Sequence, residues 1–108
     1  MNLISRAEEL LLLAIWTLQD ESYGAMLRDY LVEATDEDWS IGVVYNTLDR
    51  LARKGFVRTS LGDPTPERGG RAKRYFHLTA EGVESLERIR TVQNSLWSEL
   101  PILNLRNA

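Results

Sequence analysis

The feature that most constrains the fold is one β-hairpin pattern in a chain whose other segments have helical periodicity. Residues Phe56–Leu61 are β-like, and the cluster Gly62-Asp63-Pro64-Thr65-Pro66 breaks the strand. A second strand is predicted over Lys73–Leu78, where alternation puts Phe76 and Leu78 on the face toward the core. Arg74 shares that face, and the opposite face carries Lys73, Tyr75 and His77. The chain is therefore expected to combine helices with one small hairpin.

Four helices are predicted around the hairpin, and each follows a residue that can cap it. The candidate caps are Ser5 with Glu8, Ser22, Ser40 and Thr79. Gly55 is expected to end the third helix and Pro101 the fourth. Apolar stripes recur at helical spacing in the first three helices: Ala7, Leu10, Leu11, Ala14, Ile15 and Leu18; Tyr23, Leu27, Tyr30, Leu31 and Ala34; Ile41, Val44, Leu48 and Leu51.

The order of these elements predicts a winged helix-turn-helix that is mainly α with a small β-hairpin. We assign residues 1–78 to this unit and residues 79–108 to a long C-terminal dimerisation helix and tail, all in one compact unit. In such folds the third helix enters the DNA major groove, and the loop of the hairpin, the wing, reaches the neighbouring backbone or minor groove.

Positive charge is concentrated in the third helix and the hairpin. The whole chain has a net charge of −3, but residues 50–77 hold eight Lys and Arg against two Asp and Glu. This segment therefore carries +6, and the remainder carries −9. Such asymmetry predicts a local positive field on an anionic body. A solvated surface with chance clustering is the alternative.

The exposed face of the third helix predicts how DNA is read. With the apolar stripe inward, the opposite face carries Val43, Asn46, Thr47, Arg50, Arg53 and Lys54. Asn46 can pair with adenine and Arg50 with guanine, whereas Arg53 and Lys54 are better placed for phosphates. Asp49 can accept from cytosine or orient a neighbouring arginine. The predicted DNA contacts of the wing are Arg68, Arg71 and Lys73.

The last helix has a long apolar stripe for so small a domain. Its members recur at three- and four-residue intervals: Val83, Leu86, Ile89, Val92, Leu96 and Leu100. A core of this size has little apolar surface left to cover such a helix, so a dimer interface is favoured over a helix folded back on its own core. Leu12 and Trp16, which lie off the stripe of the first helix, are expected to join this interface.

The residue inventory disfavours an enzyme. There are no cysteines and only one histidine, His77, and we find no nucleophile–base pair, phosphate loop or metal cluster. No cofactor is expected. The apolar run Leu10–Trp16 is too short to span a bilayer, and Glu8 and Glu9 argue against a signal peptide, so a cytoplasmic protein is expected.

Two segments together resemble the PadR family of bacterial transcriptional regulators. In SIGVVYNTLDRLARKGFV, the residues Gly42, Tyr45, Leu48, Arg50, Leu51 and Gly55 match the recognition-helix pattern of that family. In GGRAKRYFHLTAEG, its wing pattern is matched by Gly70, Arg71, Arg74, Tyr75, Phe76, Leu78, Thr79 and Gly82. Tyr23-Gly24 also fits, and the resemblance covers roughly residues 8–90. An acidic linker, Thr35–Trp39, and an added Pro64-Thr65-Pro66 in the wing depart from the pattern.

The resemblance implies a homodimeric regulator, usually a repressor, that binds a palindromic operator and uses Tyr45 on DNA. It also implies the branch of the family in which one C-terminal helix makes the dimer. Some relatives bind flat aromatic molecules between subunits, and here Trp97, Gln93 and Trp16 could line such a site. Ordinary interface packing is the other interpretation of these tryptophans.

A winged-helix protein–protein adaptor without direct DNA binding is the alternative function, since fold does not fix function. An adaptor would tend to show an apolar or mixed patch on the third helix. The polar and cationic residues found there favour DNA instead.

Overall fold

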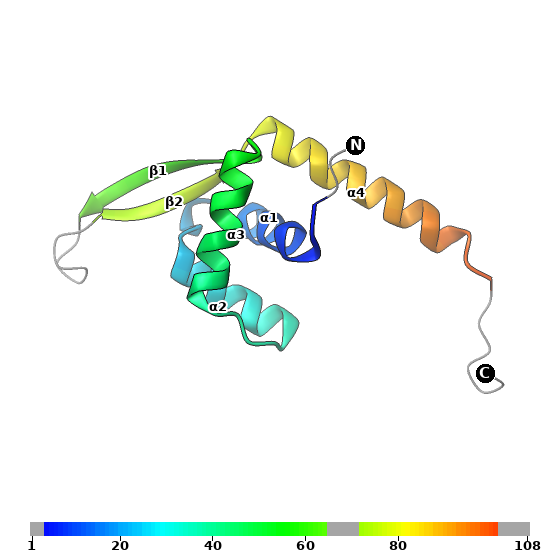
Figure 1. Cartoon of the computed structure of the whole chain (residues 1–108), viewed down its shortest axis with the longest axis horizontal. Coiled ribbons are helices and arrows are strands. Elements are labelled where there is room, and N and C mark those ends of the chain that lie inside the picture. Colours follow the sequence, from blue (N-terminus) through cyan, green and yellow to red (C-terminus); the bar gives the residue numbers. More distant parts are fainter. Residues whose placement is uncertain (1–3, 65–71, 102–108) are drawn as a thin grey trace.

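The computed structural model describes residues 4–64 and 72–101 and has the predicted architecture (Figure 1). Three helices and a short 3₁₀ turn precede an antiparallel hairpin, and a long helix follows it. The elements are α1 (Arg6–Leu18), η1 (Gln19–Glu21), α2 (Gly24–Thr35), α3 (Ile41–Arg53), β1 (Val57–Pro64), β2 (Ala72–Leu78) and α4 (Ala80–Ser98). Across the described residues, none of the helices has both the length and the apolar character needed to cross a membrane.

Three of the four predicted caps are confirmed. Ser5 and Glu8 form a complete capping box, in which the Glu8 N–H donates to Ser5 Oγ (3.1 Å) and the Ser5 N–H donates to Glu8 Oε1 (2.8 Å). Ser40 Oγ accepts from the Val43 N–H at 3.0 Å. Thr79 Oγ1 likewise caps α4. These bonds satisfy backbone donors that the first turn of a helix leaves free.

The prediction for the start of α2 is wrong, because Ser22 is used elsewhere. The N-cap is Tyr23, and Ser22 is fully buried with its Oγ donating to the Ile15 carbonyl at 3.2 Å. The Ser22 carbonyl accepts from the Phe76 N–H (2.8 Å), and Tyr23 forms a β-bridge with Tyr75. The segment between α1 and α2 therefore fastens the end of α1 to the hairpin.

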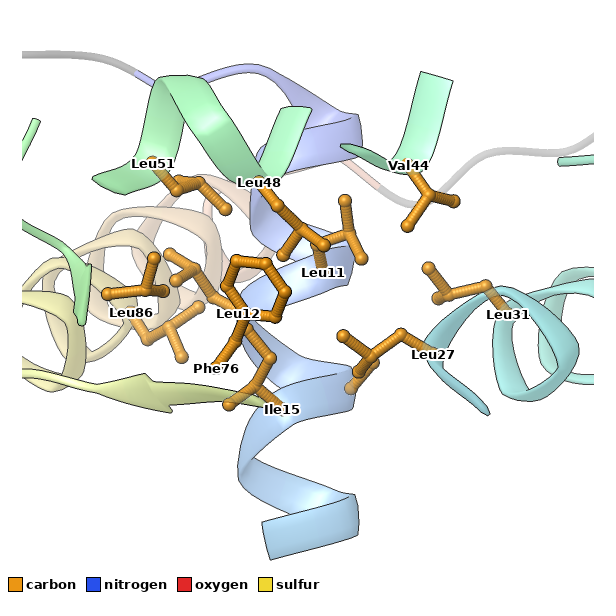
Figure 2. Packing of buried hydrophobic residues seen from close by; sticks show 12 residues of the cluster. Leu11, Leu12, Ile15, Leu27, Leu31, Val44, Leu48, Leu51, Phe76 and Leu86 are labelled. Atoms are coloured by element: carbon orange, nitrogen blue, oxygen red, sulfur yellow. The ribbon is translucent and has the colours of Figure 1, made fainter. Parts of the chain in front are cut away.

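The core surrounds α1, which contributes more buried side chains than any other described element (Figure 2). Leu27 and Leu31 of α2 pack on one side of it, and Phe76 of β2 is fully buried against it. The remaining buried apolar residues are Leu11, Leu12, Ala14, Ile15, Val44, Leu48, Leu51, Val57 and Leu86. Ile41 and Ala34, predicted on core stripes, are exposed instead because they lie near the outer ends of their helices.

The hairpin pairs Val57 with Leu78 at its base and is regular as far as Leu61–Arg74. Beyond that pair the register shifts between Leu61 and Pro64, so β1 continues past its predicted end. Phe76 points into the core as predicted. Arg74 does not, because its guanidinium lies over the Phe76 ring (5.1 Å to the centroid) and remains solvent-accessible.

α4 starts beside the turn that ends α3 and then runs away from the body (Figure 1). Gly55, with φ of +80°, makes this turn as predicted. The Thr79 N–H donates to the Phe56 carbonyl (3.1 Å), and Thr79 Oγ1 donates to the Gly55 carbonyl (2.6 Å). Gly82 also faces the Phe56 carbonyl so closely that a Cβ atom there would overlap it. The first turn of α4 is thus fixed to the body by backbone contacts.

Candidate nucleic-acid interface

The outer face of α3 carries the side chains predicted to read DNA. Asn46, Arg50 and Arg53 are exposed on it, one helical turn apart in sequence, together with Val43. Among the described residues, no carboxylate lies within 4.0 Å of the guanidinium of Arg50 or Arg53. Both cations therefore remain available to a polyanion.

Thr47 is not on this face, which corrects one predicted DNA contact. Its side chain is buried, with the residue only 1% exposed, and Oγ1 donates to the Val43 carbonyl at 2.7 Å. Arg50 Nη2 donates to the same hydroxyl at 3.4 Å. Bonding to the carbonyl one turn back lets a threonine enter the core without an unsatisfied hydroxyl. Thr47 accordingly orients the guanidinium of Arg50 through a hydrogen bond from the buried side of α3.

Tyr45 lies on the border between the core and the exposed face. It is half-buried, and its ring rests on Gly24 at the start of α2. A Cβ atom at Gly24 would overlap the ring and hydroxyl of Tyr45, so this glycine permits the two helices to approach. Tyr45 therefore sits where the N-terminus of α2 meets α3.

Lys54 has an intramolecular partner that the helical pattern does not reveal. Its Nζ pairs with Glu8 Oε2 at 2.7 Å, joining the end of α3 to α1. The Glu8 side chain is only 4% exposed. Burial raises the pKa of this carboxyl, but hydrogen bonds from Lys54 and from the backbone and hydroxyl of Ser5 outweigh burial, and the pKa of Glu8 is lowered. The predicted phosphate contact Lys54 is thus paired within the chain, with its side chain 38% exposed.

We expect Lys54→Met to lower the free energy of unfolding at neutral pH by about 2 kcal/mol. The substitution leaves a buried carboxylate unpaired, and the cost is below that of a fully buried pair because Lys54 is partly exposed. Since the pKa of Glu8 is lowered in the folded protein, the pair stabilises fully above the ordinary value of 4.5 and its contribution is lost as pH falls through the lowered value.

Urea unfolding of both proteins from neutral to acidic pH measures this difference. The control is Arg88→Met, which breaks a largely exposed pair with Glu84 (3.8 Å) and should change stability little. Equal stability of wild type and Lys54→Met at neutral pH would contradict the assignment.

Strand β2 is joined to the helices by two further contacts. Arg74 Nη1 lies 3.5 Å from Asp49 Oδ1 on α3, so Asp49 pairs with β2 instead of with Arg50 or Arg53. Lys73 Nζ lies 4.3 Å from the centroid of the Tyr23 ring, and that ring packs edge-on against Tyr75. Lys73 is thereby held near the N-terminus of α2. The predicted contacts Arg68 and Arg71 lie outside the described residues.

The predicted dimer interface divides into buried and free parts. Leu12 and Leu86 belong to the core of the single chain, so the prediction is wrong for both. They have almost no surface left because α1 is central and the first turns of α4 pack against it. Val83 and Ile89 are half-buried. The remaining predicted members are exposed on α1, along α4 or just beyond its end: Trp16, Val92, Leu96 and Leu100.

The three residues suggested for an effector are only partly together. Trp16 and Gln93 line a cavity of about 260 Å³ between α1 and α4, where Gln93 Nε2 also donates to Glu9 Oε2 (3.4 Å). Trp97 is not part of this lining and is 73% exposed further along α4. Within one chain, therefore, Trp97 does not face Trp16 across the cavity.

Comparison with known proteins agrees with the fold. The family model described as "Transcriptional regulator PadR-like family" matches residues 12–88. A comparison with curated proteins gives no match.

Solved structures with the same fold are found at low sequence identity. A PadR-like transcription factor from Bacteroides fragilis is 23% identical, with a TM-score of 0.70 over 84% of this chain and 82% of the other. A PadR family transcription regulator from hypervirulent Clostridium difficile is 20% identical (TM-score 0.67; 87% and 93%). A winged-helix DNA-binding protein from STIV is 18% identical (TM-score 0.67; 88% and 95%). Since the family model matches most of its length, the chain belongs to the PadR-like family and is a transcriptional regulator with the winged-helix fold, not an enzyme.

Proposed function

We propose that this regulator is a homodimeric, sequence-specific repressor of a palindromic operator. The observation that carries the proposal is the outer face of α3, where Asn46, Arg50 and Arg53 are exposed and the two arginines have no carboxylate partner among residues 4–64 and 72–101. Exposed guanidinium groups on a recognition helix are suited to guanine edges and phosphates. An adaptor would tend to show an apolar or mixed patch on α3. Here exposed Val43 is accompanied by Asn46, Arg50 and Arg53, so the face is mainly polar and cationic.

Base reading is assigned to Asn46 and Arg50, and backbone contacts to the residues around them. Arg50 is the stronger candidate because Thr47 holds its guanidinium by a hydrogen bond, which reduces the freedom lost on binding. Tyr45 at the α2–α3 junction and Lys73 at the N-terminus of α2 are positioned for phosphates. Arg53, Arg68 and Arg71 complete the proposed set.

The dimer is assigned to residues 79–108, chiefly to the outer part of α4. Val92 and Leu96 are exposed there and Leu100 is exposed just beyond its end, and a second chain would cover all three. A symmetric dimer presents two copies of α3 and therefore reads an inverted repeat. We place a small planar aromatic effector in the cavity beside Trp16 and Gln93. Trp97 does not line this cavity within its own chain, so it would contact the effector only from the partner subunit.

The experiment is selection of bound sequences from a random DNA pool by wild type, Arg50→Ala and Arg53→Ala. We expect wild type to select a palindrome. Arg50→Ala should lose about tenfold to a hundredfold in affinity and no longer prefer one base at one position of each half-site. Arg53→Ala, with the same change in charge on the same helix, should weaken binding to all sequences equally.

An unchanged preference in Arg50→Ala would show that Arg50 does not read a base. Failure of wild type to enrich any sequence would contradict the proposed function and favour the adaptor alternative.

A further inference from the structure

Two aliphatic side chains are exposed on the first turns of α3. The solvent-facing side of a helix that packs on a core is normally polar. Ile41 is 45% exposed and Val43 is 49% exposed. Val43 is three residues before Asn46 and seven before Arg50, so the three side chains share one stripe of the helix. Ile41 lies on a different stripe, near Tyr45.

The surroundings of Val43 leave only its methyl groups for recognition. Its N–H donates to Ser40 Oγ (3.0 Å), and its carbonyl accepts from Thr47 Oγ1 (2.7 Å). The neighbouring hydroxyl that could have read DNA, that of Thr47, is buried by the same contact. A valine in a helix is also nearly restricted to one χ1 rotamer, so its methyl groups are held in place before binding.

The chemistry of the major groove offers one apolar group that matches such a side chain. Residues near the N-terminus of a recognition helix contact base edges, and the C5-methyl group of thymine is the apolar feature of those edges. In the proposed function Asn46 and Arg50 contact base edges, and Val43 on the same stripe would then also face the bases and not the backbone. A single exposed valine is ordinary on a protein surface. Val43, however, lies beside the two residues that are proposed to read bases, which suggests a role in recognition.

We propose that Val43 contacts a thymine C5-methyl group in each half-site, beside the base pairs read by Asn46 and Arg50. This inference rests on the proposed function, in which α3 lies in the major groove. This contact adds a preference for thymine that depends on its C5-methyl group. The hydrogen-bonding groups on α3 cannot sense that methyl group.

The test replaces each thymine of the selected operator by deoxyuridine, which removes the C5-methyl and preserves base pairing. At one position, wild type should bind about fourfold more weakly for one half-site and about fifteenfold more weakly when both are replaced. Val43→Ser should bind thymine and uracil DNA equally at that position. Val43→Thr, which keeps one methyl group, should retain part of the discrimination.

Ile41→Ser is the matched control, since it removes an equally exposed aliphatic side chain from the same end of α3. It should discriminate between thymine and uracil as wild type does. Circular dichroism establishes that all three variants are folded. The proposal is overturned if wild type is insensitive to uracil at every position, or if Val43→Ser keeps the discrimination. If wild type selects no operator at all, the proposed function itself fails, and this inference falls with it.

Discussion

Affinity for operator DNA is expected to fall at least about a thousandfold when salt rises from about 50 to about 200 mM. Binding of cations to phosphates releases counterions. The logarithm of the affinity therefore falls linearly with the logarithm of the salt concentration, with a slope of about −0.9 for each phosphate contact. Lys54 is not counted, because its Nζ is paired with Glu8. The proposed phosphate contacts Arg53, Arg68, Arg71 and Lys73 amount to about eight contacts for a dimer and a logarithmic slope of about −7.

The slope is measured by titrating labelled operator at several salt concentrations. Arg53→Ala should make it less negative by about two, because each protomer loses one phosphate contact. Arg88→Ala is the control, since this exposed residue lies on α4, outside the proposed DNA interface, and its loss should leave the slope unchanged. A wild-type slope near zero would show that the positive segment does not meet phosphates.

Gly82→Ala is expected to destabilise the fold by about 3 kcal/mol, a large share of the stability of a domain of this size. The added Cβ atom would overlap the Phe56 carbonyl, which is backbone and cannot rotate away. The same carbonyl accepts the Thr79 N–H, so moving α4 to relieve the overlap also strains the start of that helix. Urea unfolding at fixed protein concentration measures the loss.

Gly42→Ala is the matched substitution. Gly42 is also in the first turn of a helix, but the nearest atom to its added Cβ would be Ser40 Oγ at 4.0 Å. Alanine is the better helix former, so this variant should be more stable by about 0.5–1 kcal/mol. Comparable stability of the two variants would mean that the approach of α4 to Phe56 is not a tight one.

Local signals predicted the helices well because their causes are local. The caps at Ser5, Ser40 and Thr79 depend on groups three residues away, and all three are formed. Ser22 has the same character in the sequence, but its hydroxyl and carbonyl bind Ile15 and Phe76 instead. A pattern that looks only at neighbours cannot choose between a local cap and a tertiary contact.

At the candidate nucleic-acid interface, prediction from the sequence failed for the same reason, because tertiary contacts decided the outcome. The period of α3 predicted a core face, but the rotation of the helix about its axis is set by packing against α1 and α2, which brings Thr47 inside. The Glu8–Lys54 and Asp49–Arg74 pairs join residues far apart in the chain, and nothing in either segment indicates its partner. The signs of the charges were readable, but which of them remain free was not.

The separation of α3 into an anchored side and an open side has an evolutionary consequence. Val44, Leu48, Leu51 and the Lys54 ion pair hold the helix, whereas positions 43, 46 and 50 touch the core little or not at all. Substitutions at these three positions can therefore accumulate with little loss of stability. After gene duplication, two copies of this protein can diverge toward different operators while both remain folded, and a designer can retarget the chain by the same three positions.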